Sequence, residues 1–249
     1  MKVLAALLAV AASAALAQPV GTASTDVPFG PGERLTFDVR FGPVRVGNAA
    51  MEVRDFTAIR GRRAYHTQFT LRGGTFFYKV NDVLQSWIDT ETLSSLRFVQ
   101  DLEQGSRERE RRFEIYPDRR VFVEASSENP VEQESVDNPL DDASFLYFIR
   151  TVSLNVGEQH EFNRYFRPDR NPVTIRVLRR ERVTVPAGSF DAVVLRPTIK
   201  SRGIFAEGGQ AEVWISDDER RLVLQIRSRL SFGSISLHLR SYTPPSGSR

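Results

Sequence analysis

Apolar and polar residues alternate along much of the chain. Leu35, Phe37, Val39 and Phe41 are apolar, and the residues between them are polar. This period of two is typical of a β-strand that buries one face. Comparable runs, bounded by turn residues, predict further strands over residues 44–53, 65–71, 96–102, 107–116, 121–124, 159–167, 173–185, 190–200, 211–215, 222–226 and 235–239. Residues 75–89 predict either a long pair of strands or one bent strand.

Turn signals separate these strands. Gly73 and Gly74 predict a turn after the third run, and residues 104–106 predict a hairpin between two later runs. Residues 185–188 read Val-Pro-Ala-Gly, with Pro and Gly at the second and fourth positions, which fits a type I turn. Short turns of this kind predict that consecutive strands lie antiparallel.

A different period appears over residues 140–152. Phe145, Phe148, Ile149 and Val152 fall at i, i+3, i+4 and i+7, which predicts one short amphipathic helix. Asn138 or Asp141 can cap the start of this segment, and Asp141 and Asp142 suit the positive end of the helix dipole. This is the one helix that the pattern predicts in the mature chain.

Many antiparallel strands and a single helix predict a mainly β fold. The acidic segment 125–139 has few apolar residues and indicates a loop before the helix. So many strands must avoid exposed edges, which favours one antiparallel, strongly curved sheet, either an incomplete barrel or a twisted sandwich. We expect the helix to plug an open end or to cover an exposed apolar face.

The first residues have the pattern of a secretory signal peptide. Lys2 precedes an apolar run over residues 3–16, and Ala15-Leu16-Ala17 supplies a small-x-small cleavage site after Ala17. The run is shorter than the roughly 20 residues of a spanning helix, and no cysteine follows it for lipid attachment. The pattern therefore predicts a periplasmic or secreted protein with no transmembrane span after signal removal. It divides the chain into a signal peptide (1–17), a flexible leader (18–28), a single β-rich domain (29–242) and a disordered tail (243–249).

Composition narrows the chemistry. The 249 residues include no cysteine, which excludes thiol nucleophiles, thiolate zinc sites and iron–sulfur clusters. The formal net charge is +3, and only Lys2, Lys79 and Lys200 are lysines. The arginines are interleaved with glutamates rather than gathered into a basic stripe, so the sequence does not predict a nucleic-acid partner.

No local motif for a catalytic or metal site stands out. His66, His160 and His238 are far apart and form no His-x-x-x-His pair, so each is interpreted as an ordinary strand residue. No Gly-x-Ser-x-Gly elbow is present, although a triad assembled from distant segments stays open. We predict no catalytic residue, no metal, no cofactor and no enzymatic activity.

Two groups of acids have competing interpretations. Asp141 and Asp142 could be paired acid/base carboxylates, but helix capping explains them better. The acids at residues 217–219 could bind a hard cation, but a solvated turn opposing the arginines at 220 and 221 is the stronger interpretation.

An alternating run gives the first candidate site. Arg107, Arg109 and Arg111 would line one face of a strand and could contact phosphate or lipopolysaccharide; cross-strand ion pairs on a solvated face are the simpler alternative.

Aromatic residues give the second candidate site. Their number is consistent with packing in the core or with an apolar cavity that binds a lipid. The candidate ligand-binding residues are Phe76, Phe77, Tyr78, Trp87, Tyr147, Phe148, Phe205 and Trp214.

Several segments, taken in order, resemble the bacterial family called domain of unknown function 3108. They span roughly residues 29–242 and comprise residues 32–37, 46–49, 141–150 with Val156-Gly157, 185–192, 213–221 and 232–235. The chain has Leu222-Val223 where the family's strand-end motif has a proline after its paired arginines. The resemblance implies an exported, β-rich envelope protein and brings no catalytic residue.

Three functions follow as hypotheses. The first is a non-enzymatic periplasmic protein that binds or carries an apolar or amphipathic envelope molecule such as a lipid; its expected half-barrel is similar to that of periplasmic lipoprotein carriers, an analogy of architecture alone. The second is a structural or interaction module of an envelope assembly. The third is a hydrolase acting on envelope glycans or esters. The sequence leaves the ligand and the oligomeric state open.

Overall fold

The computed structural model describes residues 27–75, 78–200, 210–230 and 233–247. Over these residues the chain forms one antiparallel sheet of fourteen strands, a helix α1 (Ser144–Phe148), and two 3₁₀ turns, η1 (Pro117–Arg119) and η2 (Pro168–Arg170). The strands before the helix are β1 (Arg34–Phe41), β2 (Val44–Ile59), β3 (Arg62–Thr75), β4 (Tyr78–Asp89), β5 (Ser95–Gln104), β6 (Arg107–Tyr116), β7 (Val121–Glu124) and β8 (Glu132–Glu134). The strands after it are β9 (Gln159–Phe162), β10 (Val173–Val185), β11 (Gly188–Thr198), β12 (Glu212–Ser216), β13 (Val223–Leu230) and β14 (Gly233–Thr243).

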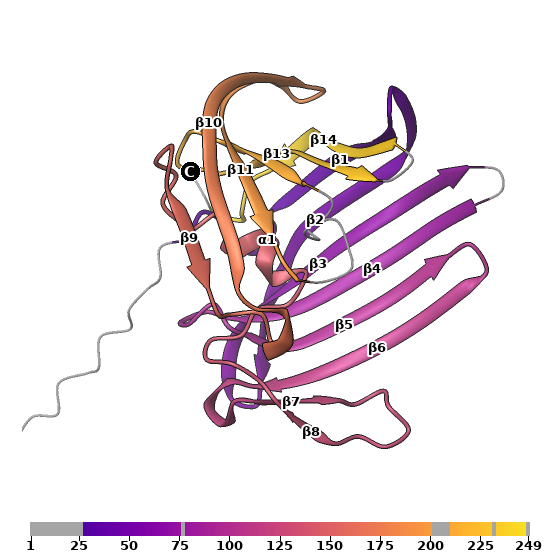
Figure 1. Cartoon of the computed structure of the whole chain (residues 1–249), viewed down its shortest axis with the longest axis vertical. Helices are drawn as coiled ribbons and strands as arrows, with labels where there is room; N and C mark the ends of the chain where they lie inside the picture. Colours follow the sequence, from indigo (N-terminus) through magenta and orange to yellow (C-terminus); the bar gives the residue numbers. More distant parts are fainter. Residues whose placement is uncertain (1–26, 76–77, 201–209, 231–232, 248–249) are drawn as a thin grey trace, which may run out of the picture.

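The sheet consists of two meanders that share one seam. Strands β1 to β8 pair in sequence, as do β9 to β14, and β1 pairs with β14 to join them. The edge strands β8 and β9 do not pair, so the sheet curves around α1 without closing into a barrel (Figure 1). The prediction of one strongly curved antiparallel sheet with a single short helix is confirmed.

A short bridge links the two ends of the sheet near the helix. The Leu140 N–H donates to the Arg164 carbonyl at 2.5 Å, and the Phe166 N–H donates to the Leu140 carbonyl at 2.9 Å. The bridge is parallel and isolated, so it ties the ends without adding a strand. It also explains why the predicted strand over residues 159–167 ends at Phe162: the chain leaves the sheet to reach Leu140.

The prediction of a turn at Gly73 and Gly74 is wrong. Both residues belong to β3 and pair with Val80 and Lys79 of β4. Gly73 faces Gly47 on β2, and a Cβ atom on Gly73 would lie 2.8 Å from the Gly47 Cα atom. These glycines therefore permit two strand backbones to approach closely. A pair of glycines in a sequence can indicate such an approach as readily as a turn.

The loop predicted over residues 125–139 contains a short strand. Strand β8 (Glu132–Glu134) pairs with β7, and all three of its side chains are exposed. Three consecutive solvated positions leave no hydrophobic alternation, so the pattern could not show this strand.

Helix α1 is shorter than the predicted segment 140–152. At its start, the Asp141 carboxylate accepts hydrogen bonds from the backbone N–H groups of Ala143 and Ser144, both at 2.8 Å. At its end, the Thr151 hydroxyl donates to the Phe148 carbonyl at 2.8 Å. In a longer helix this carbonyl would accept a hydrogen bond from the backbone N–H group four residues later. All five helical residues are buried, because the sheet curves around the helix.

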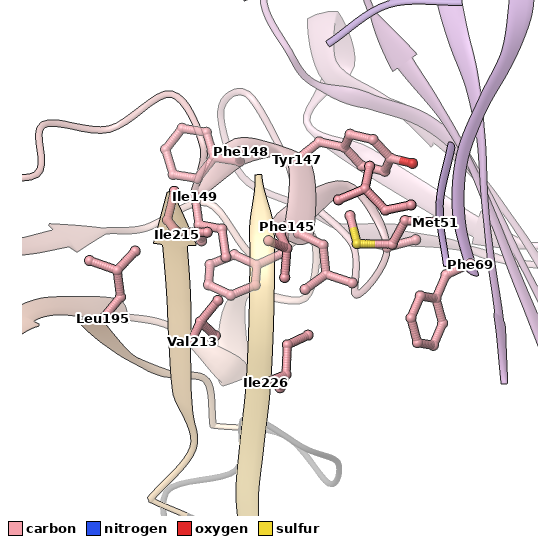
Figure 2. Packing of buried hydrophobic residues seen from close by; sticks show 14 of the residues in the cluster. Met51, Phe69, Phe145, Tyr147, Phe148, Ile149, Leu195, Val213, Ile215 and Ile226 are labelled. Carbon is pink, nitrogen blue, oxygen red and sulfur yellow. The ribbon is translucent and has the colours of Figure 1, made fainter. Parts of the chain in front are cut away.

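The core lies between α1 and the face of the sheet that it contacts, here called the inner face. Phe145 and Ile149 point toward the ends of β12 and β13, and Met51 and Phe69 approach from the other meander (Figure 2). Cross-strand register carries the inner face through Leu195, Val213, Ile226, Leu237 and Val39 in one continuous row. The opposite side of the sheet is the outer face.

A buried ion pair fastens the helix to the sheet. The guanidinium of Arg150 donates to both carboxylate oxygens of Glu33, at 2.7 and 2.8 Å, and neither side chain is more than 1% exposed. Arg150 also donates to three backbone carbonyl groups, those of Pro28, Arg220 and Arg221. The residue before β1, the segment after α1 and the turn before β13 therefore meet at one buried cation, each nitrogen of which has an acceptor.

Candidate functional site: a mixed patch on the inner face

The inner face changes character on β3 to β6, away from the helix. The side chains of Leu71, Leu84 and Leu102 are partly exposed there, although they point to the same side as the core. Register places Leu71, Asp82, Leu102 and Arg109 side by side across four strands. Together with two neighbours on the same face, they form the inner patch, which consists of Leu71, Asp82, Leu84, Leu102, Gln104 and Arg109.

Asp82 is the unusual member of the inner patch. It is 7% exposed and its Oδ2 atom accepts a hydrogen bond from the Gln104 side chain at 2.7 Å. Its Oδ1 atom is buried and makes no hydrogen bond. Burial raises the pKa of the Asp82 carboxyl, and the hydrogen bond from Gln104 offsets this only in part. The Asp82 carboxyl therefore forms a polar point beneath the leucines, with its Oδ1 atom covered by the protein.

The three arginines that the sequence singled out do share the inner face, but they differ in their surroundings. Arg111 binds Glu124 through two hydrogen bonds of 2.5 Å and lies over the Phe113 ring at 4.6 Å. The hydrogen bond from Arg111 lowers the pKa of the Glu124 carboxyl. Arg107 and Arg109 are exposed and have no ion pair with a residue that the structure describes. Arg107 and Arg109 are therefore exposed cations on this face, and Arg109 also acts on the Glu124 carboxylate from a distance.

Polar groups close the helix end of the patch. Asp142 accepts a hydrogen bond from the Tyr165 hydroxyl at 3.0 Å and from the Gln100 side chain at 3.3 Å. Burial raises the pKa of the Asp142 carboxyl, and the hydrogen bond from Tyr165 acts in the opposite direction. Gln100 lies beside Leu84 on the inner face. The apolar stretch therefore has a charged rim at Arg109 and a polar one at Asp142.

The aromatic residues predicted to bind a ligand are not brought together. Tyr147 and Phe148 belong to α1 and are buried in the core, and the Tyr147 hydroxyl donates to the Glu52 carbonyl at 2.9 Å. Tyr78 is 51% exposed at the first position of β4. Phe76, Phe77 and Phe205 lie outside the described residues.

Both tryptophans of the predicted set lie on the outer face. Trp87 stacks on His66 with ring centroids 4.5 Å apart. Trp214 donates from its indole nitrogen to Glu181 at 2.6 Å and is 2% exposed. The sequence could not assign them to a face, because a tryptophan on the outer face can be covered by arginine or histidine side chains and so be buried as well as one on the inner face.

Sequence reasoning also missed Asp82 and Gln104. A signal was available, because Asp82 is the single acid between Val80 and Leu84 in a run of inward positions. An acid in such a row conflicts with simple core packing and marks a place worth testing for function.

The histidines and the acidic turn that the sequence raised as candidates have structural roles. The three histidines lie on β3, β9 and β14, each with its own local hydrogen bond. In the acidic turn at residues 217–219, Asp218 pairs with Arg220 as the solvated turn predicts, whereas Asp217 pairs with Arg180 of β10 and Arg221 donates to the Val152 carbonyl. Among the described residues, no three His, Cys, Asp or Glu side chains gather closely enough to hold a metal ion. The described part of the chain also has no helix with the length and apolarity needed to cross a membrane.

The fold resembles that of a solved structure. The chain is similar to the crystal structure of a beta-barrel-like protein of domain of unknown function DUF1849 from Brucella abortus, with a TM-score of 0.58 and 12% identity over 88% of this chain and 99% of that one. It also aligns with a "putative lipoprotein" from Parabacteroides distasonis at a TM-score of 0.38 and 11% identity, over 87% of this chain and 98% of that one. At 12% identity, the first likeness concerns the fold alone.

Sequence comparison gives one further finding. Residues 36–240 match the model of the family described as "Protein of unknown function (DUF3108)". None of the curated proteins matches the chain.

Proposed function

The chain belongs to the DUF3108 family, and from that premise we propose that it is an exported, non-enzymatic protein whose inner patch binds an amphipathic molecule of the cell envelope, such as a lipid. The proposal has two parts, export and binding, which rest on separate observations.

Export rests on the N-terminal pattern. A positive residue, an apolar run and the Ala15-Leu16-Ala17 site stand in the order that a cleaved signal peptide requires. The complete absence of cysteine agrees with a protein whose stability does not depend on the redox state of its compartment. Mass measurement of the protein recovered from a periplasmic fraction tests this part, because cleavage after Ala17 leaves Gln18 as the first residue.

One observation carries the binding part: the row Leu71, Asp82, Leu102 and Arg109 on the inner face. Apolar side chains that remain partly exposed there leave area that an acyl or other apolar group can cover. A partly unpartnered buried carboxyl lies within this apolar row, and an unpaired arginine stands beside it. An amphipathic ligand matches this order, with its apolar part on the leucines and an anionic group at Arg109.

Native mass spectrometry of the mature protein, purified without detergent, tests the proposal. We expect a reproducible additional mass that is lost on denaturation. Leu102→Gln should abolish it, because an uncompensated amide would lie against the apolar part of the ligand. Val99→Gln is the matched control: Val99 is also partly buried and lies on β5, but it points to the outer face.

Two results would contradict the proposal. One is an unliganded mass for the wild-type protein that persists after incubation with an extract of envelope lipids. The other is equal loss of the additional mass in both variants.

A further inference from the structure

A second site lies on the opposite side of the sheet from the inner patch. Register sets Arg196, Glu212 and Arg227 next to one another on β11, β12 and β13, with their side chains on the outer face. Together with Gln210 and Arg229 they line a pocket of about 40 Å³. That volume holds about three water molecules, or one small oxyanion of similar size.

The single carboxylate in this pocket is already satisfied. Glu212 accepts hydrogen bonds from Arg196 at 2.9 Å, from Arg227 at 3.1 Å, and from Arg179 at 3.3 and 3.4 Å. Burial alone would raise the pKa of the Glu212 carboxyl, but the hydrogen bonds from Arg179 and Arg196 outweigh it and lower the pKa. Glu212 therefore stays ionised and holds the arginines in place, with little capacity left to bind a cation.

The arginines keep unused donors. A guanidinium group has five N–H bonds, and Arg196 and Arg227 each direct one terminal nitrogen to Glu212. The Nε atom of Arg196 is buried without a hydrogen-bond partner. Arg229 follows Arg227 by two positions on β13, so it points to the same face, and it forms no ion pair with a described residue. Three arginines against one glutamate leave the lining with an excess of two positive charges.

The surrounding contacts hold this cationic pocket in shape. The Arg227 guanidinium lies 5.0 Å from the centre of the Trp214 ring, and Glu181 anchors the Trp214 indole. Arg179 connects Glu181 to Glu212. Arg196 and Arg227 are therefore held in place before binding and lose little side-chain entropy when an anion enters, whereas Arg229 is exposed and must be ordered by the anion.

We propose that the outer-face pocket of Arg196, Arg227 and Arg229 binds a small tetrahedral oxyanion, namely phosphate, either free or as the headgroup of a lipid. Arginine forks match the oxygens of phosphate, and the pocket volume admits one such group. The site lies on the other face of the sheet from the inner patch, so it stands whether or not that patch binds a ligand.

Isothermal titration calorimetry of the mature protein with inorganic phosphate, at low ionic strength, tests the proposal. We expect saturable binding that weakens as salt is added. Arg229→Gln should reduce the affinity by about tenfold, because it removes a charge-assisted hydrogen bond without breaking an ion pair of Glu212. Arg229→Lys should retain part of the affinity, since it keeps the charge.

Arg176→Gln is the matched control. Arg176 pairs with Arg196 across the strands and donates to Gln159, but it does not line the pocket. Its loss changes the net charge by the same amount, so the phosphate affinity should be unchanged. A second titration with dihexanoyl phosphatidate, a short-chain lipid, separates the two sources of the phosphate group. Binding of either probe that requires Arg229 supports the site and identifies the source. Absence of saturable binding to both probes, or equal weakening by R229Q and R176Q, would overturn it.

Discussion

Arg150 is a cation held wholly inside the protein. Its guanidinium meets Glu33 and three backbone carbonyl groups, so the charge is paired and each nitrogen has an acceptor. In many proteins the desolvation free energy of two buried ions exceeds their mutual attraction, so the intact pair need not add much to the free energy of unfolding. Removing one member is different, because it leaves the other charge buried alone.

We therefore expect Glu33→Gln to lower the free energy of unfolding by about 3–5 kcal/mol. Urea denaturation followed by tryptophan fluorescence measures it. Arg34→Gln is the neighbouring control: Arg34 pairs with Glu52 but its side chain is 55% exposed, so its loss should cost about 1 kcal/mol or less. Similar costs for the two variants would show that the buried pair has no special weight.

Asp141 gives a prediction about pH. Burial raises the pKa of its carboxyl to about 6, against hydrogen bonds from Ser86, Ser144 and Ser95 that favour ionisation. The native state thus holds this proton more tightly than the unfolded chain. The contribution of Asp141 to stability is fully present below about pH 4 and declines as the pH rises toward 6.

Asp141→Asn tests this assignment, because the amide can accept from the Ala143 and Ser144 N–H groups and stays neutral. Relative to wild type, the variant should gain stability between pH 4 and pH 7, by an amount on the order of 2–3 kcal/mol. Denaturation at several pH values gives the difference. A difference that does not change with pH would mean that the carboxyl titrates normally in the fold.

At the scale of elements, the period of two identified most strands because their inner faces are buried and their outer faces are solvated. Strand β10 matches its predicted range from Val173 to Val185. The pattern failed where its physical cause was missing. Strand β8 is exposed at every position, and the ends of α1 depend on the Asp141 and Thr151 side chains rather than on periodicity.

The glycine contact between β2 and β3 can be tested directly. Gly73→Ala would place a Cβ atom 2.4 Å from the Val46 carbonyl oxygen, so the strands must separate. Gly61→Ala is the control: Gly61 has a φ of +80° but open space around it, and its cost is limited to about 1–2 kcal/mol of backbone strain. We expect Gly73→Ala to be the more destabilising in urea. Equal effects would mean that the strand spacing adapts.

At the scale of the whole molecule, local patterns do not determine which distant strands meet. The pairing of β1 with β14 joins the two ends of the sequence, and no alternation in either strand specifies its partner. The inner patch has the same origin. Its residues come from four strands, and only the register shows that Asp82 and Arg109 lie in one row. The same holds for Trp87 and Trp214. Their hydrophobicity predicted that they bind the ligand, but the register places both on the outer face of the sheet.

The two ends of the sheet are also joined by an aromatic cluster. Phe166, which follows β9, packs against Phe98, Phe113 and Phe122 of the other meander with ring centroids 5.0–6.3 Å apart. Phe166→Ala should lower the free energy of unfolding by about 3–5 kcal/mol and should accelerate amide exchange in β7. Phe56→Ala, at a ring that is 41% exposed, is the control. Unchanged exchange in β7 would show that the cluster does not hold the ends together.

The seam between β1 and β14 has a consequence for chain connectivity. Pro245 lies against Gly30, and the Ser246 N–H donates to the Pro31 carbonyl at 2.8 Å, so the start and end of the described fold are neighbours. A circular permutant that joined these ends and opened the chain between β8 and β9 would run β9 to β14 and then β1 to β8. Every strand would then pair with the next one along the polypeptide. Its contact order would fall, and with it the entropic barrier to folding. In the natural order, β1 can complete its pairing only after the last strand has been made.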